Sequence, residues 1–297
     1  MNYKTNKYSK AFTLLELLVA VSVISMMSSV ILAAVQNARD KGRISGGIRF
    51  ATNAYRAFGD KMSAYFDFNG NPTYKDVAGS IAVASPASSP NGQTPVKQST
   101  SYSSYAYSSI NFARNTPSGT YQFLRTFNTS TNNAIVLPPA GAISVWIRAN
   151  SDSAVDNLIA ADGAGTPTFS MYIPNSSSAS NANQVVVVDK TTLVSGVKVA
   201  DGNWHNITWS SPTNGPEKLY VDGNLVDQED ITGSRSSKKF FYIGYNGKVP
   251  ETTGALAFQG DMDDFMMFQQ DLAESEVKQI YAMGAPSHPV AKANSSK

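Results

Sequence analysis

The chain contains no cysteine, and among its 297 residues only His205 and His288 are histidines. It therefore forms no disulfide or thiolate metal site, has no cysteine for lipoprotein acylation, and offers few ligands for a histidine-rich metal centre. Charged residues are scarce as well, at 15% against 42% hydrophobic residues, where about a quarter is usual. Ser, Thr, Asn and Gly are abundant instead. This profile favours a β-rich, extracytoplasmic protein over a cytosolic helical enzyme.

The net charge excludes one class of partner. The formal charge is +2, and three of the basic residues, Lys4, Lys7 and Lys10, lie within the first 11 residues. Without them the charge is 2 − 3 = −1, so the chain has no bulk attraction for polyanions. We therefore do not expect nucleic acid as a partner.

One long apolar run follows these lysines. From Phe12 to Val35 every residue is apolar, Ser or Thr, except Glu16. A helix of 24 residues rises about 36 Å, enough to cross a hydrocarbon core of about 30 Å. The lysines on its N-terminal side predict a cytoplasmic N-terminus. Glu16 is unusual because a carboxylate in the membrane is costly and generally has a partner.

The residues around Glu16 resemble a known processing signal. A basic leader, a small residue and "FTLLELLVAVSVI" are similar to the N-terminus of type IV pilins and pseudopilins. The resemblance implies that residues 1–11 are a leader, that a prepilin peptidase cuts between Ala11 and Phe12, and that the new N-terminus is methylated. It also implies a role in filament assembly, in which Glu16 neutralises the Phe12 amine of a neighbouring subunit. The family usually has Gly where this chain has Ala11, and the alternative is an uncleaved anchor whose Glu16 reaches the membrane interface.

The helical pattern continues beyond the membrane span. Ile44, Ile48, Ala51, Tyr55 and Phe58 recur at spacings of three and four residues, which predicts an amphipathic helix to about residue 60. Glycines 42, 46 and 47 predict a bend or a local melting point. A pilin-type helix over residues 12–60, with its transmembrane part at about 12–35, is therefore expected.

Residues 62–284 show a different pattern. Short alternating runs such as "AISVWIRA", "HNITWS" and "KLYVDG" are separated by Gly, Asn, Pro and Ser, which is typical of a sandwich or jelly roll. The order of "SAYFDFNG", "DGNWHNITW", "FQGDMDDFMMF" and "LAESEVKQIYAMG" resembles laminin-G-like, concanavalin A-like domains. This resemblance implies an antiparallel jelly roll with a short C-terminal helix, hence an α+β chain overall, followed by a flexible tail at 285–297. Residues 71–140 match poorly.

Three carboxylates in "GDMDDF" are the candidate metal ligands, Asp261, Asp263 and Asp264. Strand alternation places Asp261 and Asp263 on one side and Asp264 on the other. Some laminin-G-like domains bind calcium at the sandwich rim, and hard oxygen ligands suit that ion, but it needs six to eight of them. The alternatives are a calcium site and carboxylates that accept hydrogen bonds from turns.

We find no pattern for catalysis. Retaining glycoside hydrolases need two carboxylates about 5 Å apart, and the glutamates here are scattered through turns and the last helix. The tyrosines of "STSYSSYAYSS" suggest stacking on sugars, or simply an exposed loop. The basic residues of "GSRSSKKFF", Arg235, Lys238 and Lys239, predict a solvated turn.

The sequence therefore predicts a pilin-like subunit, not an enzyme. It is inserted in the inner membrane as a single-pass precursor and later moves into an extracellular filament or onto the cell surface. There its head contacts a glycan or protein ligand, and its other partners are pilin subunits and the prepilin peptidase. The alternatives are a pseudopilin of a secretion machine and a monomeric, membrane-anchored lectin.

Overall fold

The structure is a computed structural model, and it divides the chain into two compact units, Met1–Gly42 and Arg43–Lys297. The residues it describes are 13–68, 82–84, 92–93, 96–99, 108–112, 114–115, 120–122, 124–127, 136–150, 156–162, 168–175, 177, 180–231, 236–239, 242–244 and 258–288. The predicted cleavage between Ala11 and Phe12 lies outside these residues, as do the tyrosines of "STSYSSYAYSS".

A single helix, α1 (Leu14–Phe58), confirms the predicted N-terminal helix and ends two residues before the expected position. It is continuous through glycines 42, 46 and 47, so this described segment is not interrupted at the predicted melting point. In the described part of the chain one stretch, Leu14–Arg39, is long and apolar enough to cross a membrane, and none of its apolar window is buried.

The last turns of α1, within the second unit, pack on the β domain. Phe50, Ala54 and Phe58 are buried and repeat at four-residue spacing, so they form one helix face. They join an apolar cluster with Phe268 and with the C-terminal helix α2 (Glu274–Gly284). The compact unit therefore begins at Arg43, before the predicted domain start at residue 62.

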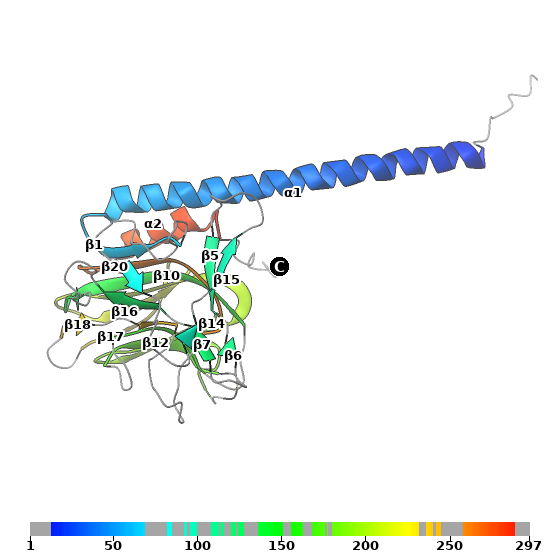
Figure 1. The fold of residues 1–297 in the computed structure, drawn as a ribbon. Helices are drawn as coiled ribbons and strands as arrows, with labels where there is room; N and C mark the ends of the chain where they lie inside the picture. Colours follow the sequence, from blue (N-terminus) through cyan, green and yellow to red (C-terminus); the bar gives the residue numbers. More distant parts are fainter. Residues whose placement is uncertain are drawn as a thin grey trace, which may run out of the picture. The chain divides into compact units, whose positions relative to one another are not determined.

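Two mainly antiparallel sheets form the sandwich, as predicted (Figure 1). The first has the order β17 (Asn224–Glu229), β16 (Glu217–Val221), β15 (Asp201–Ser211), β10 (Gly141–Asn150), β20 (Gly260–Phe268), β5 (Ser108–Phe112), β4 (Val96–Ser99), and β1 (Met62–Phe66) pairs with β20. The second has the order β14 (Thr192–Lys198), β13 (Gln184–Val188), β12 (Ser170–Ile173), β11 (Asn157–Ala161), β19 (Tyr242–Ile243), β8 (Leu124–Phe127), β2 (Ala82–Ala84).

Short strands form two smaller sheets. One pairs β18 (Lys238–Lys239) with β9 (Val136–Leu137). The other combines β6 (Arg114–Asn115), β7 (Thr120–Gln122) and β3 (Gly92–Gln93), and the β3–β7 pair is parallel. Many of these short strands fall in the region where the sequence patterns are weak.

Alternation along the strands builds the core between the sheets. On β10, Ile143, Val145 and Ile147 face the core between the sheets, whereas Trp146 on the same strand faces the opposite way. We call that opposite side, which α2 covers, the outer face of the first sheet (Figure 1).

Two local predictions have clear outcomes. The run "LYVDGNLV" is typical of a hairpin that turns at Asp222-Gly223 or at Gly223-Asn224; in the β16–β17 hairpin the first pair has the positive φ, 52° and 76°. The flexible tail predicted from residue 285 is wrong for its first four residues. Ser287 and His288 are buried, because the chain folds back onto the outer face after α2.

Candidate functional site

A β-bulge on β20 turns the Asp264 side chain to the opposite side of the strand from the one that alternation predicts. The pairing of β10 with β20 shifts register between Ser144 and Trp146, and Asp264 has a φ of 47°. The extra residue of a bulge reverses the alternation, so the Asp264 carboxylate joins that of Asp263 on the outer face. The sequence-based alternation is therefore wrong for Asp264.

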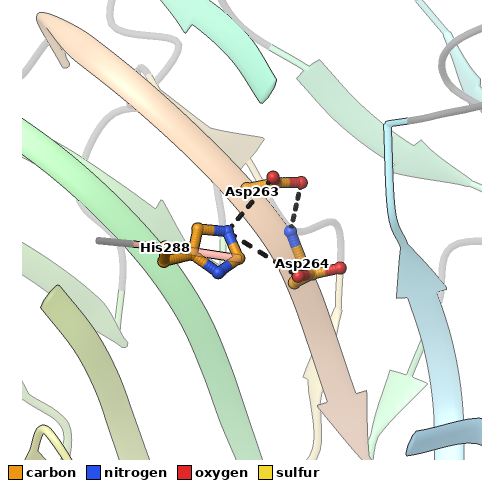
Figure 2. Close-up of side chains that lie close together, drawn as sticks. All are labelled: Asp263, Asp264 and His288. Atoms are coloured by element: carbon orange, nitrogen blue, oxygen red, sulfur yellow. Dashed lines mark hydrogen bonds and ion pairs between the residues drawn. The ribbon is translucent and has the colours of Figure 1, made fainter. Parts of the chain in front are cut away.

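His288 lies against both carboxylates (Figure 2). Its Nε2 is 3.2 Å from Asp263 Oδ2 and 3.8 Å from Asp264 Oδ2. Its Nδ1 is 3.1 Å from the carbonyl oxygen of Gly284. Because both ring nitrogens face acceptors, the geometry suits a protonated imidazole that pairs with the Asp263 carboxylate.

The remaining carboxylate oxygens are also engaged. The backbone N–H of Asp264 donates to Asp263 Oδ1 at 2.9 Å, and the Tyr65 hydroxyl donates to Asp264 Oδ1 at 2.6 Å. Burial raises the pKa of the Asp264 carboxyl well above its usual value, and the charge of Asp263 raises it further. Burial, followed by the charge of Asp264, likewise raises the pKa of Tyr65.

Two tryptophans enclose the imidazole. Trp146 stacks on it with ring centroids 4.3 Å apart and an interplanar angle of 8°, and Trp204 meets it edge to face at 4.8 Å. His288 has an exposed fraction of 0%. The cluster therefore attaches the segment after α2 to the outer face of the first sheet, and a ligand from solvent cannot reach it.

The donor set does not fit calcium. Asp263, Asp264 and His288 each bring one ligand atom within 4.8 Å of the others, but one of the three is an imidazole nitrogen, and calcium takes six to eight oxygens. Asp261 lies outside this group. The three predicted carboxylates therefore do not converge on one ion.

Asp261 belongs to a different site, at the rim. It lies opposite Arg148 on β10 and Asn111 on β5. Arg148 donates to its Oδ2 from Nε at 2.8 Å, and Asn111 donates to its Oδ1 at 2.8 Å. The Arg148 guanidinium also lies over the Trp204 ring, 5.3 Å from the centroid. The planar face of the guanidinium therefore contacts Trp204, while its N–H groups donate to Asp261.

A pocket opens beside this pair, and we call it the rim pocket. It lies where β5 and β10 end and β15 and β20 begin, and its volume is about 390 Å³. Its walls are mostly polar: Asn111, Phe112, Arg148, Asn150, Gly202, Gln259, Gly260, Asp261. The Arg148 side chain remains 45% exposed, so it has donors left for a ligand. Amides, a guanidinium and a carboxylate in the lining suit a ligand rich in hydroxyl or carboxyl groups.

Sequence reasoning missed Arg148 and Asn111. They are distant from Asp261 in the chain, and only strand pairing makes them neighbours. A basic and an amide residue near the ends of exposed strand faces would have been the only signal. His205, by contrast, lies on β15 and is hydrogen-bonded to Asp222, in the β16–β17 turn, and to Asp201 at the start of β15.

Glu16 is the single carboxylate of the apolar stretch Leu14–Arg39. Glu16 Oε2 accepts hydrogen bonds from the backbone N–H and the hydroxyl of Thr13, both at 2.9 Å, and the Glu16 N–H donates back to the Thr13 hydroxyl. This is a capping box. Glu16 is exposed, as are its apolar neighbours.

Comparisons with known proteins agree with both parts. The family described as the concanavalin A-like lectin/glucanases superfamily matches residues 118–278, and the prokaryotic N-terminal methylation motif matches residues 6–32. No curated protein matches the chain.

Solved structures show the same fold at low identity. One match is a structure of botulinum neurotoxin type C, a toxin whose cell entry is described as dependent on interaction with two ganglioside molecules. It has a TM-score of 0.53 at 15% identity, and the match covers 76% of this chain and 52% of that chain. The binding domain of botulinum neurotoxin serotype D has a TM-score of 0.54 at 16% identity, covering 77% and 52%. The chain thus spans about half the length of these relatives.

Domain 4 of the arabinanase AbnA of Geobacillus stearothermophilus, solved with arabinotriose, has a TM-score of 0.51 at 15% identity, covering 74% of this chain and 98% of that one. More than half of the present chain matches the superfamily. The chain therefore belongs to the concanavalin A-like lectin/glucanases superfamily and has a pilin-like methylation motif at its N-terminus.

Proposed function

We propose that the chain is a subunit of a type IV pilus-type filament and presents its lectin-like domain to ligands outside the cell. One observation carries the proposal. The methylation motif leads directly into an apolar stretch, Leu14–Arg39, whose apolar window is unburied and which carries a single carboxylate, in the same chain as the sandwich. An apolar surface of that size requires a membrane or other helices as partners.

Glu16 supplies the assembly contact in this proposal. In a single subunit its carboxylate is satisfied by Thr13. In a filament the amine of a neighbouring Phe12 replaces that partner, because an ammonium in an apolar surrounding needs a counter-charge. The capping box keeps the carboxylate at the helix start until that exchange.

The rim pocket binds carbohydrate in this proposal, and the chain acts by binding and not by catalysis. Support comes from its hydrogen-bonding groups and from relatives with the same fold. The serotype D neurotoxin domain was solved with N-acetylneuraminic acid and the arabinanase domain with arabinotriose. The exposed Arg148 favours a sugar that carries a carboxylate.

N-terminal sequencing tests the filament role. The surface protein is expected to begin with a methylated Phe12, and imaging is expected to show it along filaments. A surface protein that begins at Met1 would exclude this role and leave the anchored lectin. Correct processing without surface filaments would favour the secretion-machine alternative.

A glycan array tests the pocket. The full chain in detergent is expected to bind acidic glycans, and Arg148→Ala is expected to weaken binding at least tenfold. Lys198→Ala is the matched control, because Lys198 is an exposed cation on β14 in the other sheet. Equal binding by both variants would place the ligand elsewhere.

A further inference from the structure

A buried lysine lies at the edge of the sandwich. The sequence predicts Lys238 in a solvated turn, but the structure leaves it only 1% exposed. Its ammonium lies 5.1 Å from the ring centroid of Trp209 and 5.7 Å from that of Phe169. Burial of such a cation is expensive unless it has a charged partner.

Asp189 is that partner. Its Oδ2 is 2.9 Å from Lys238 Nζ, and its side chain is 3% exposed. The two atoms are within hydrogen-bond distance, yet neither has a partner in hydrogen-bond geometry. The amine therefore lies against the carboxyl group without the alignment of an ordinary ion pair.

A second acid completes the cluster. Glu217 is fully buried, and its carboxyl accepts hydrogen bonds from the hydroxyls of Thr191 and Ser211. Burial, with a hydrogen bond and repulsion from Asp189, raises the pKa of Glu217 to about 7. Glu217 is therefore about half protonated at pH 7, and its protonated form can donate a proton to the neighbouring Asp189.

These groups form an amine, a carboxyl group and a proton donor in a water-poor site. We propose that Lys238 and Asp189 condense into an amide bond between their side chains, with Glu217 as the general acid. Proximity favours this reaction, since effective molarities in well-oriented intramolecular reactions reach about 10⁵ M and more. The aromatic walls of Trp209 and Phe169 exclude the water that would reverse it.

The steps balance without any further reactant. The Lys238 ammonium gives a proton to the Asp189 carboxylate, which leaves a neutral amine and a carboxylic acid. The amine attacks Cγ of Asp189 and forms the C–N bond. Glu217 protonates the departing hydroxyl, which leaves as water, and regains a proton from the amide nitrogen.

The crosslink would fasten one edge of the domain. Asp189 follows β13 in the turn to β14, and Lys238 lies in β18. The bond would close the long segment between them, and a crosslink of this kind stabilises by restricting the unfolded chain. It would give a cysteine-free protein the covalent support that a disulfide gives elsewhere. This inference does not depend on the filament role or on the rim pocket.

Mass spectrometry of the full chain tests it. The purified protein is expected to lack the mass of one water molecule. A tryptic digest is expected to contain a branched peptide that joins residues 149–190 to residues 236–239, which is independent of N-terminal processing. Lys238→Met is expected to restore the full mass, and Lys239→Arg, the matched control at the adjacent lysine, is expected to keep the branched peptide.

Glu217→Gln separates reaction from folding, because it keeps both reacting groups and a neutral side chain of the same shape. Bond formation is expected to slow at least tenfold, so that the crosslinked fraction rises with time after purification. In the parent protein the rate is expected to fall as the pH rises above about 7. Full mass and no branched peptide in folded parent protein after prolonged incubation would overturn the crosslink. An unchanged rate in Glu217→Gln would overturn the role of Glu217.

Discussion

The two units of this chain depart from the usual distribution of residues in opposite ways. The first exposes its apolar side chains, with Leu14 81% and Met26 73% accessible. The second buries ionisable side chains, including Lys238, Asp263 and Glu217. An exposed apolar helix needs a partner outside the subunit, whereas a buried charge needs one inside it. The comparison indicates that the apolar helix needs a binding partner outside the subunit, whereas the sandwich supplies the partners of its buried ionisable groups itself.

The substitution Glu16→Ala is the most sensitive test of whether the N-terminal helix needs partner subunits. We expect the surface-displayed fraction to fall at least tenfold, because the amine of each neighbour would lose its counter-charge. Immunoblots of sheared surface and membrane fractions measure it. Glu274→Ala is the control, since Glu274 is an exposed glutamate at the start of α2. Equal display of both variants would contradict the assembly contact.

His288→Ala tests whether the sandwich depends on the partners of its buried ionisable groups. It leaves the buried Asp263 carboxylate without its imidazole partner, and breaking a buried pair typically costs about 3–5 kcal/mol. Urea denaturation of the full chain in detergent measures the loss. His205→Ala is the matched control at the other histidine, where a partly exposed pair is worth about 1 kcal/mol or less. Similar losses in both variants would show that the His288 cluster is not specially stabilising.

A pair of glycine substitutions compares packing in the two units. A Cβ at Gly284 would lie 2.5 Å from Trp146 Nε1, whereas one at Gly42 meets nothing within 4 Å. We expect Gly284→Ala to cost about 1–3 kcal/mol. Gly42→Ala should instead stabilise its helix by about 0.5–1 kcal/mol. Thermal melts followed by circular dichroism distinguish them, and a harmless Gly284→Ala would contradict the close packing of α2.

Substitution of His205 is expected to change the stability by a smaller amount that depends on pH. Burial alone would lower the pKa of His205, but hydrogen bonds and charge from Asp222 and then Asp201 outweigh it and raise the pKa. The resulting stability is complete below the unfolded pKa of about 6.5 and is lost as the pH rises through the folded value. His205→Gln should therefore lose more stability at pH 5.5 than at pH 8.5. A loss independent of pH would indicate that only packing is involved.

The smallest expected effect is that of calcium. Because the carboxylates of β20 are divided between Arg148 and His288, EDTA and added calcium should leave the melting temperature unchanged. A rise with calcium that EDTA reverses would restore the metal hypothesis.

Local patterns predicted much of this fold. The long helix, the Asp222–Gly223 hairpin and the sandwich strands each follow from residues close together in the chain, through hydrophobic periodicity and turn chemistry. The sites were less predictable. The alternation that places Ile143 and Ile147 in the core fails at Asp264, because a bulge depends on pairing with a distant strand.

By itself the sequence determined the helix, its single carboxylate, its processing motif and the sandwich class, because each depends on composition and short-range spacing. Only the tertiary structure decided which charges are buried and which groups face each other. Lys238 meets Asp189, His288 meets Asp263, and Arg148 meets Asp261. Each pair joins residues far apart in the chain. Their chemistry therefore arises only when the strands pair and exclude water.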